Sequence, residues 1–100
     1  MQPISMNQVI GGKRYRTETA TLIASDAYWD GHNWERRGRN TFLFKTPNDN
    51  YFAQLQSQWQ GERARIDPLS KEDAISMYEI LPEKEEDFEI AFPGTTVEDA

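Results

Sequence analysis

The sequence contains no cysteine and one histidine among its 100 residues. The lack of cysteine excludes disulfide bonds and thiolate zinc sites. No apolar run approaches the roughly 18 residues that a membrane-spanning helix needs. The first residues also lack the basic start and apolar core of a secretory signal. We therefore expect a soluble protein of the cytoplasm that makes no membrane contact.

Constellations that support catalysis or hold a cofactor are also missing. Gly11-Gly12 lacks the Lys-Ser/Thr pair and the helix that would follow a phosphate-binding loop. The single histidine, His32, lies in a predicted loop beside Asp30 and Glu35. These residue types can bind a metal, but in loops they more often form turn hydrogen bonds. We therefore expect no enzyme activity, no metal and no cofactor.

The length is that of one domain with a modest core. Hydrophobic residues make up only 37 % of the chain, so the core depends on its aromatic residues, which bury large areas each. We expect a single domain over 1–100, with a loose leader over 1–12 and an acidic tail over 95–100. The sequence leaves open a homodimer as a further source of burial.

Residues 41–60 predict a β-hairpin, because apolar and polar residues alternate with a period of two. A four-residue loop over 46–49 would pair Phe44 with Tyr51 and Phe42 with Ala53. This register would place the apolar residues on one buried face and a row of glutamines on the solvent face. The apolar set is Phe42, Phe44, Tyr51, Ala53, Leu55 and Trp59, and the glutamines are Gln54, Gln56, Gln58 and Gln60.

The other elements follow from turn and cap signals. A turn is expected over 17–19 and a strand over 20–29, with a helix over 17–29 left open. A short strand over 63–66 should end at Asp67-Pro68-Leu69. A helix over 71–81 should be capped by Ser70 and stopped by Pro82. Residues 88–92 favour a helical turn over a strand. The predicted fold is α+β: a three- to four-stranded antiparallel meander with one C-terminal helix packed on one face.

The charge is divided unevenly along the chain. Residues 1–66 hold nine Lys/Arg against six Asp/Glu, whereas residues 67–100 hold two against eleven. Such asymmetry can mark an interaction surface, although solvated acidic runs are common. Two sets of residues are candidates for partner binding. They are an acidic strip of Glu79, Glu83, Glu85, Glu86, Asp87 and Glu89, and an aromatic loop with Tyr28, Trp29 and Trp34.

A basic sheet face offers an alternative interaction surface. In the predicted hairpin, the face opposite the aromatic core carries arginines and a lysine beside the glutamine row. These side chains can contact phosphates and bases, which would suit a small nucleic-acid-binding regulator. The net charge of −6 argues against this alternative. The residues are Arg37, Arg39, Lys45, Arg63 and Arg65.

Three segments carry a resemblance to a known group of proteins. Lys13–Ala20, Phe44–Asn48 with the following Tyr51-Phe52, and Ile66–Ala74 are similar to a family of small, largely uncharacterised proteins of phages, plasmids and other mobile elements. The family usually has aspartate at the position of Arg16 and Asn-Gly at Asn48-Asp49. Its motifs are turns and caps, so no catalytic residue is carried over.

The resemblance implies a counter-defence role in the cytoplasm of a host cell. The function that we expect is that of a non-enzymatic inhibitor. Its partner would be a host protein or ribonucleoprotein effector of the CRISPR or restriction type, bound by protein–protein contact. Binding to nucleic acid through the basic face is the alternative.

Overall fold

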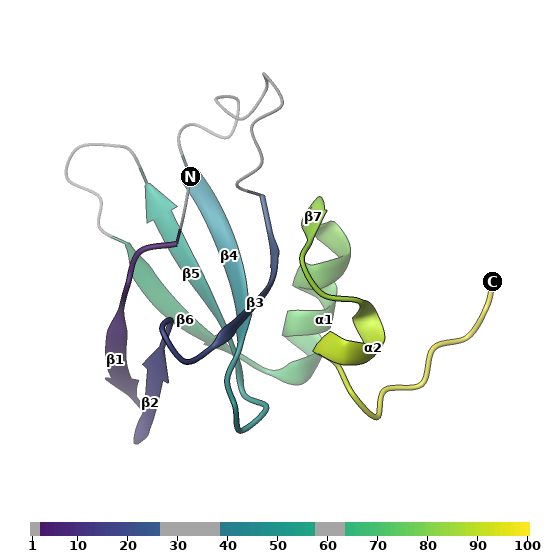
Figure 1. Cartoon of the computed structure of the whole chain (residues 1–100), viewed down its shortest axis with the longest axis horizontal. Coiled ribbons are helices and arrows are strands. Elements are labelled where there is room, and N and C mark those ends of the chain that lie inside the picture. The colour runs from purple at the N-terminus through teal and green to yellow at the C-terminus, as the bar shows by residue number, and fades with distance from the viewer. Residues whose placement is uncertain (1–2, 27–38, 58–63) are drawn as a thin grey trace.

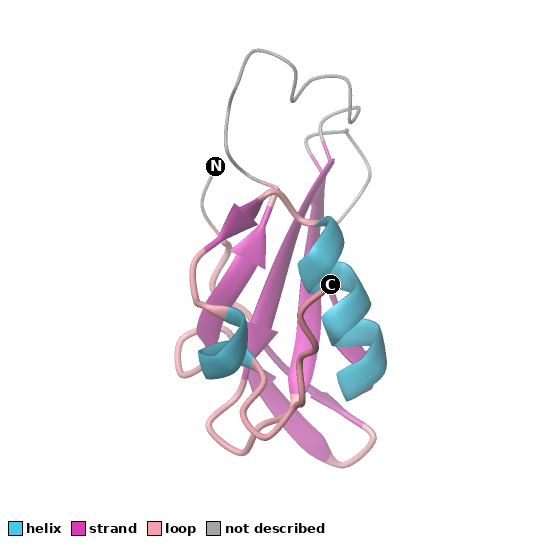
Figure 2. Cartoon of the chain, turned by 90° about the vertical axis from the view of Figure 1, so that its right-hand side faces the viewer, coloured by secondary structure: helices cyan, strands magenta, loops and turns pink. Residues whose placement is uncertain are grey.

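The computed structural model describes residues 3–26, 39–57 and 64–100 (Figure 1). Within these ranges, five strands form an antiparallel sheet in the order β6-β5-β4-β3-β7, and two short helices lie in front of it in Figure 2. The predicted α+β class with an antiparallel sheet is confirmed, but the main sheet has more strands than predicted. The elements are β3 (Thr21–Ser25), β4 (Arg39–Lys45), β5 (Tyr51–Ser57), β6 (Arg65–Leu69), α1 (Lys71–Ile80), β7 (Glu83–Lys84) and α2 (Phe88–Ala91).

A second, two-stranded sheet lies at the start of the chain. Strands β1 (Asn7–Ile10) and β2 (Lys13–Arg16) pair through a tight turn at Gly11-Gly12. Both glycines have positive φ, +59° and +81°, which two-residue hairpin turns of this kind require. The loose leader predicted over 1–12 is therefore wrong for residues 7–12. Strand β1 is mostly exposed, so its sequence lacks the alternation that marks a half-buried strand.

The register of the central hairpin differs from the prediction by one residue. Phe44 lies opposite Phe52 and Phe42 lies opposite Gln54, rather than opposite Tyr51 and Ala53. The loop contains five residues, 46–50, instead of four, and Asp49 adopts a left-handed φ of 61° within it. Two hydrogen bonds close this loop, from Asp49 N to Thr46 O at 2.9 Å and from Thr46 N to Asn50 O at 2.8 Å.

This register gives the sheet two buried faces instead of one. Leu43 and Tyr51 face the helices and form one core with residues such as Tyr78 and Phe92. The other face packs against the N-terminal hairpin, where Phe44 and Phe52 stack with ring centroids 5.1 Å apart. The aromatic residues of the predicted single core are therefore divided between two. The second core contains Tyr15, Phe42, Phe44, Phe52 and Ile66.

The predicted solvent-facing glutamine row is wrong where the structure describes it. Gln54 has no exposed surface, and Gln56 is also buried. The side-chain amide of Gln54 forms two hydrogen bonds with the backbone of Ile4: its Nε2 donates to Ile4 O at 2.6 Å, and its Oε1 accepts from Ile4 N at 3.0 Å. Gln56 Nε2 donates to the same Oε1 at 2.8 Å. The N-terminal segment therefore binds both groups of the Gln54 amide. Gln58, Gln60 and Trp59 lie outside the described residues.

The helix signals are confirmed. Ser70 caps α1, and its Oγ accepts a hydrogen bond from Asp73 N at 3.1 Å. Ala74 and Tyr78 are buried, and Leu81 is buried just after the helix ends. The favoured helical turn over 88–92 corresponds to α2.

Two strand boundaries differ from the prediction. The predicted turn over 17–19 is confirmed, but β3 covers only Thr21–Ser25 of the expected 20–29, and residues 27–29 lie outside the described part. Strand β6 continues through Pro68 to Leu69 instead of ending there. It does so because β6 is an edge strand, where the missing N–H of a proline can face away from the ladder.

Replacement of Gln54 tests the buried amide contacts. Gln54→Ala removes both hydrogen bonds to Ile4 and deprives Gln56 of an acceptor in a site without water access. We expect the free energy of unfolding to fall by about 1–3 kcal/mol, measured by urea denaturation. Gln8→Ala in exposed β1 is the matched control, with an expected change within about 0.5 kcal/mol. Equal effects of the two substitutions would contradict the structural role of Gln54.

Candidate functional site

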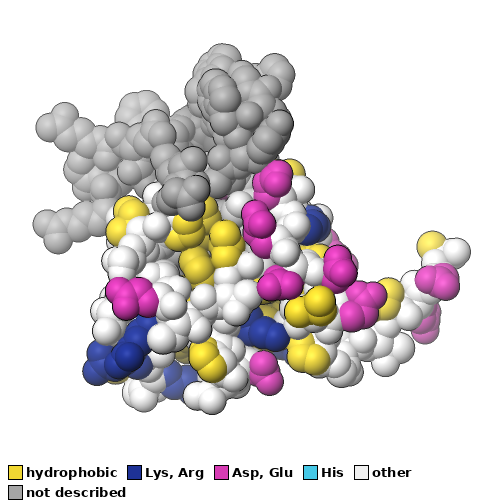
Figure 3. Space-filling model, viewed as in Figure 1, with side chains coloured by type: hydrophobic (Ala, Val, Ile, Leu, Met, Phe, Trp, Pro, Cys, Tyr) yellow, Lys and Arg dark blue, Asp and Glu magenta, His cyan; other side chains and the backbone are white. Residues whose placement is uncertain are grey.

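The residues of the predicted acidic strip lie on α1, on β7 and around α2. Glu79, Glu85, Asp87 and Glu89 are exposed, and Glu83 and Glu86 are half-buried. Figure 3 shows Asp and Glu side chains gathered over this helical side of the molecule, whereas Lys and Arg gather over the N-terminal hairpin. We call the six residues Glu79, Glu83, Glu85, Glu86, Asp87 and Glu89 the acidic surface.

The backbone beneath the acidic surface is held by the main sheet. Strand β7 pairs with β3, and Ile23 O then accepts hydrogen bonds from Glu85 N at 3.0 Å and Glu86 N at 3.3 Å. The Tyr78 hydroxyl donates to Glu86 O at 2.7 Å. Since these bonds use backbone atoms, the carboxylates themselves stay available to a partner.

The carboxylates of this surface form no ion pair with a described lysine or arginine. Among the described residues, ion pairs join Lys45 to Asp49 and Arg65 to Asp67, and neither pair involves the acidic surface. Lys84 is the cation closest in sequence, but its Nζ donates to Leu81 O and lies 5.1 Å from the centre of the Tyr78 ring. Lys45 also lies close, since its Nζ donates to Ile90 O at 3.0 Å, but the six carboxylates form no ion pair within the described residues and outnumber these two cations.

The tyrosine beneath the surface responds to this field. Burial, and then the charges of Asp87 and Glu89, raise the pKa of Tyr78 above its ordinary value of 10.0. The Tyr78 ring also packs edge-on against Phe88 and Phe92. Tyr78 thus joins α1 to α2 and fixes the acidic segment between them.

Exposed apolar side chains accompany the carboxylates. Ile80, at the end of α1, is 76 % exposed, and Ile90, on α2, is 56 % exposed. They directly follow Glu79 and Glu89 in the chain. Isolated exposed isoleucines are ordinary, but within a charged surface they offer apolar contact points to a partner. Ile80 and Ile90 were not among the predicted site residues, although each follows a glutamate in a Glu-Ile pair that is visible in the sequence.

Several predicted site residues lie outside the described part of the chain. These include the aromatic-loop residues and the weighed metal ligands. Arg37 and Arg63 of the alternative basic face are also outside it. The residues concerned are Tyr28, Trp29, Asp30, His32, Trp34, Glu35, Arg37 and Arg63.

Lys45 and Arg65 of the predicted basic sheet face lie on the helix side of the sheet and do not share a face with the described glutamines. Lys45 shares the helix-covered face with its partner Tyr51, and its Nζ donates to Ile90 O on α2 at 3.0 Å. Arg65 is exposed, but its Nε lies 3.3 Å from Asp67 Oδ1. The register still places Lys45 and Arg65 on one face, because Tyr51 and Leu55 lie opposite them. The one-residue shift moves Gln54 and Gln56 to the other face, and α2 contacts Lys45. Arg39 lies in β4, and its side chain is not described.

A different basic region lies on the N-terminal hairpin. A groove of about 440 Å³ runs between β2 and the loop that joins β4 to β5, and Lys13, Arg14 and Arg16 contribute to its lining. These residues belong to one of the three segments that resemble mobile-element proteins, and they were not predicted as site residues. The sequence does contain the basic cluster Lys-Arg-Tyr-Arg, but only the folded structure shows that it lies beside the loop that joins β4 to β5.

The described residues hold neither a cluster of metal-binding side chains nor a helix that could span a membrane. No group of three or more histidine and acidic side chains is arranged to hold a metal ion within residues 3–26, 39–57 and 64–100. In the same ranges, none of the helices has the length and apolar character needed to cross a bilayer.

Replacement of Tyr78 by phenylalanine tests the link between α1 and the acidic segment. Loss of the hydroxyl should lower the free energy of unfolding by about 1 kcal/mol at neutral pH. The stability that the hydroxyl confers is fully present below its unfolded-state pKa and is lost as pH rises through the raised folded-state pKa. Between about pH 8 and about pH 11, urea denaturation should therefore show a smaller loss for Tyr78→Phe than for the wild type. Equal losses would contradict the raised pKa.

Comparison with known proteins leaves the site to be argued from its own geometry. No family model matches the chain, and neither a curated protein nor a solved structure matches it.

Proposed function

We propose that this chain is a non-enzymatic inhibitor protein of a mobile genetic element. It would act in the host cytoplasm and block a nucleic-acid-targeting defence complex, of the CRISPR or restriction type, by protein–protein contact. The observation that carries this proposal is the acidic surface with Ile80 and Ile90 exposed within it. The resemblance of three segments to mobile-element proteins supports the choice of target class.

The charge of the acidic surface suits a partner that binds nucleic acid. Such an effector has a basic channel, and a row of fixed carboxylates competes with a phosphate backbone for the same cations. The carboxylates here stand on backbone that is anchored to β3 and to Tyr78, so little backbone conformational entropy is lost when they bind. Because Debye screening shortens the range of the attraction, the inhibition should weaken as salt increases.

The two isoleucines add apolar contacts to the electrostatic attraction. Electrostatic complementarity speeds association, whereas apolar side chains that become buried in a partner's pockets slow dissociation. Ile80 and Ile90 keep more than half of their surface exposed, which leaves most of their area to be buried on binding. Tyr28, Trp29 and Trp34 remain part of the proposal as further aromatic contacts.

Neutralisation of the acidic surface tests the proposal. Purified protein is titrated into DNA-cleavage reactions of a panel of CRISPR effector and restriction nucleases. We expect inhibition of one of them to saturate near one protein per effector. The triple variant Glu79→Gln, Glu85→Gln, Glu89→Gln should slow association about tenfold at low salt, measured by surface plasmon resonance.

The matched control neutralises carboxylates elsewhere, in the double variant Glu18→Gln, Asp67→Asn. It should associate at nearly the wild-type rate. The absence of inhibition across the panel would refute the inhibitor role. Equal rates for the triple variant and the control would refute the acidic surface as the contact.

Replacement of an exposed isoleucine tests the apolar contact separately. Ile90→Ser should raise the dissociation rate about tenfold, because a buried anchor contributes more than about 1 kcal/mol to binding. Val9→Ser is the matched control, since Val9 is also 56 % exposed but lies on β1. Both variants should unfold at nearly the wild-type urea concentration. An unchanged dissociation rate for Ile90→Ser would exclude α2 from the interface.

A further inference from the structure

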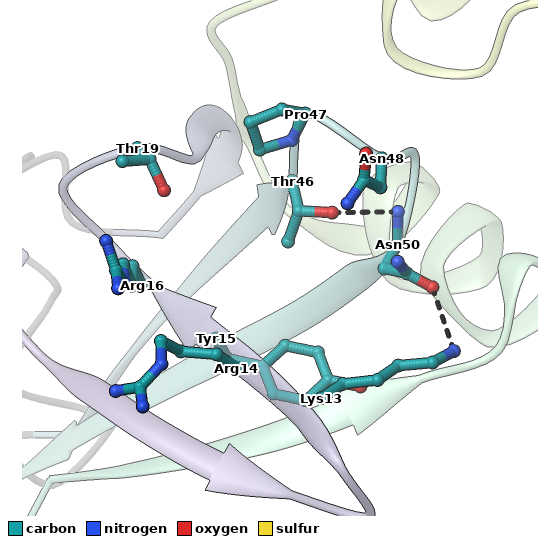
Figure 4. Close-up of a pocket in the computed structure, with 9 residues that line it drawn as sticks. All are labelled: Lys13, Arg14, Tyr15, Arg16, Thr19, Thr46, Pro47, Asn48 and Asn50. Carbon is teal, nitrogen blue, oxygen red and sulfur yellow. Dashed lines mark hydrogen bonds between the residues drawn. The ribbon is translucent and has the colours of Figure 1, made fainter.

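The groove beside β2 has a lining that differs from the rest of the surface. It lies between β2 with the following turn and the loop that joins β4 to β5, as Figure 4 shows. Its lining contains basic, amide and hydroxyl side chains and no carboxylate. The residues are Lys13, Arg14, Tyr15, Arg16, Thr19, Thr46, Pro47, Asn48 and Asn50.

Two cations stand at opposite ends of this groove. Figure 4 shows Lys13 reaching Asn50 at one end, with Arg16 near Thr19 at the other. Lys13 Nζ donates to Asn50 Oδ1 at 3.3 Å, which holds the ammonium group in place and leaves two of its hydrogens for other acceptors. Arg16 is exposed and forms no ion pair with a carboxylate of the described residues. Arg14 instead donates to Asn7 Oδ1 at 2.8 Å, along the hairpin.

Uncharged donors lie along the wall between these cations. Thr46 Oγ1 accepts a hydrogen bond from Asn50 N at 3.0 Å, so its hydroxyl hydrogen is left for another acceptor. The amide of Asn48 and the hydroxyl of Thr19 add further donors. Two carboxylates adjoin lining residues in sequence, but neither lines this groove. Asp49 Oδ1 lies 3.9 Å from Lys45 Nζ, and Glu18 Oε1 accepts a hydrogen bond from Ser5 Oγ at 2.7 Å. A site with many donors and no carboxylate is suited to an anion with several acceptor oxygens.

We propose that this groove binds the phosphate group of a small phosphorylated molecule. A volume of about 440 Å³ is in the range of small-molecule sites. The buried Tyr15 ring and the short loop leave no exposed aromatic side chain in the lining on which a base could stack. The recognition therefore depends on phosphate oxygens.

The overall charge favours a small anion over a polymer. A small ligand feels mainly the cations within a Debye length, which is about 8 Å at physiological salt. A long nucleic acid would extend further and meet the repulsion of a chain with net charge −6. This inference is independent of the proposed inhibitor role, because it concerns the N-terminal hairpin and not the acidic surface.

Titration with pyrophosphate, followed by amide chemical shifts in NMR, tests the proposal. We expect shifts confined to β2, the turn over 17–19 and the loop over 46–50. Arg16→Gln and Lys13→Gln should each weaken binding by up to about fivefold, the range of exposed charge pairs. The double variant should weaken it by more than either single change. Arg65→Gln, which removes an exposed arginine on β6, is the matched control and should bind as the wild type does.

Three results would overturn the proposal. They are the absence of any shift with pyrophosphate, shifts centred away from the groove, and equal affinity of the double variant and Arg65→Gln. The far-ultraviolet circular dichroism of each variant should match the wild type, since both substituted residues are exposed.

A second titration distinguishes the source of the phosphate. The probe is a short single-stranded oligonucleotide without terminal phosphates, which offers only phosphodiesters. It should bind more weakly than pyrophosphate under the same conditions. Tighter binding of the oligonucleotide that is lost in the double variant would replace the small-molecule site with a nucleic-acid site.

Discussion

The pairing of Phe44 with Phe52 across β4 and β5 is the constraint on which the rest of the structure depends. It goes together with a connecting loop that is one residue longer than predicted, in which Asp49 adopts a left-handed backbone conformation. Because side chains in a strand alternate between faces, this one residue decides which side chains share a face. Aromatic residues then occupy both faces of the sheet, and each face must be covered.

The two covers come from opposite ends of the chain. The N-terminal hairpin packs on the face of Phe44 and Phe52, and the helices pack on the face of Leu43 and Tyr51. Since the basic residues cluster in the first cover and the acidic residues in the second, the uneven charge along the chain becomes a separation in space (Figure 3). The acidic surface and the basic groove therefore belong to different covers of one sheet.

Buried polar groups of the sheet show how the N-terminal segment is attached to it. Gln54 is fully buried, yet its amide forms a donor and an acceptor bond with the backbone of Ile4. A side-chain amide has the same donor and acceptor as a peptide group, so it can bind a passing segment as a neighbouring strand would. A buried amide left without partners would be costly, and this requirement fixes where the N-terminal segment lies.

Local signals in the sequence were sufficient to predict several structural elements. The cap at Ser70, the stop at Pro82 and the turn over 17–19 depend on residues within a few positions of each other. The hairpin itself was also predictable, because alternation and the proline-containing loop are local features. The register of the hairpin was not predictable in this way, because a four-residue and a five-residue loop have similar composition and differ in the conformation of Asp49.

The sequence by itself determined the α+β class, the position of the main helix and the acidic character of the last third. Only the tertiary structure decided which surfaces these residues form. Lys45 contacts Ile90, 45 positions away, and Gln54 contacts Ile4, 50 positions away. The physical reason is that burial depends on which distant segment covers a face. A periodic pattern shows that a strand has an apolar face and a polar face. It does not show that another segment of the chain will pack on the polar face and bury it.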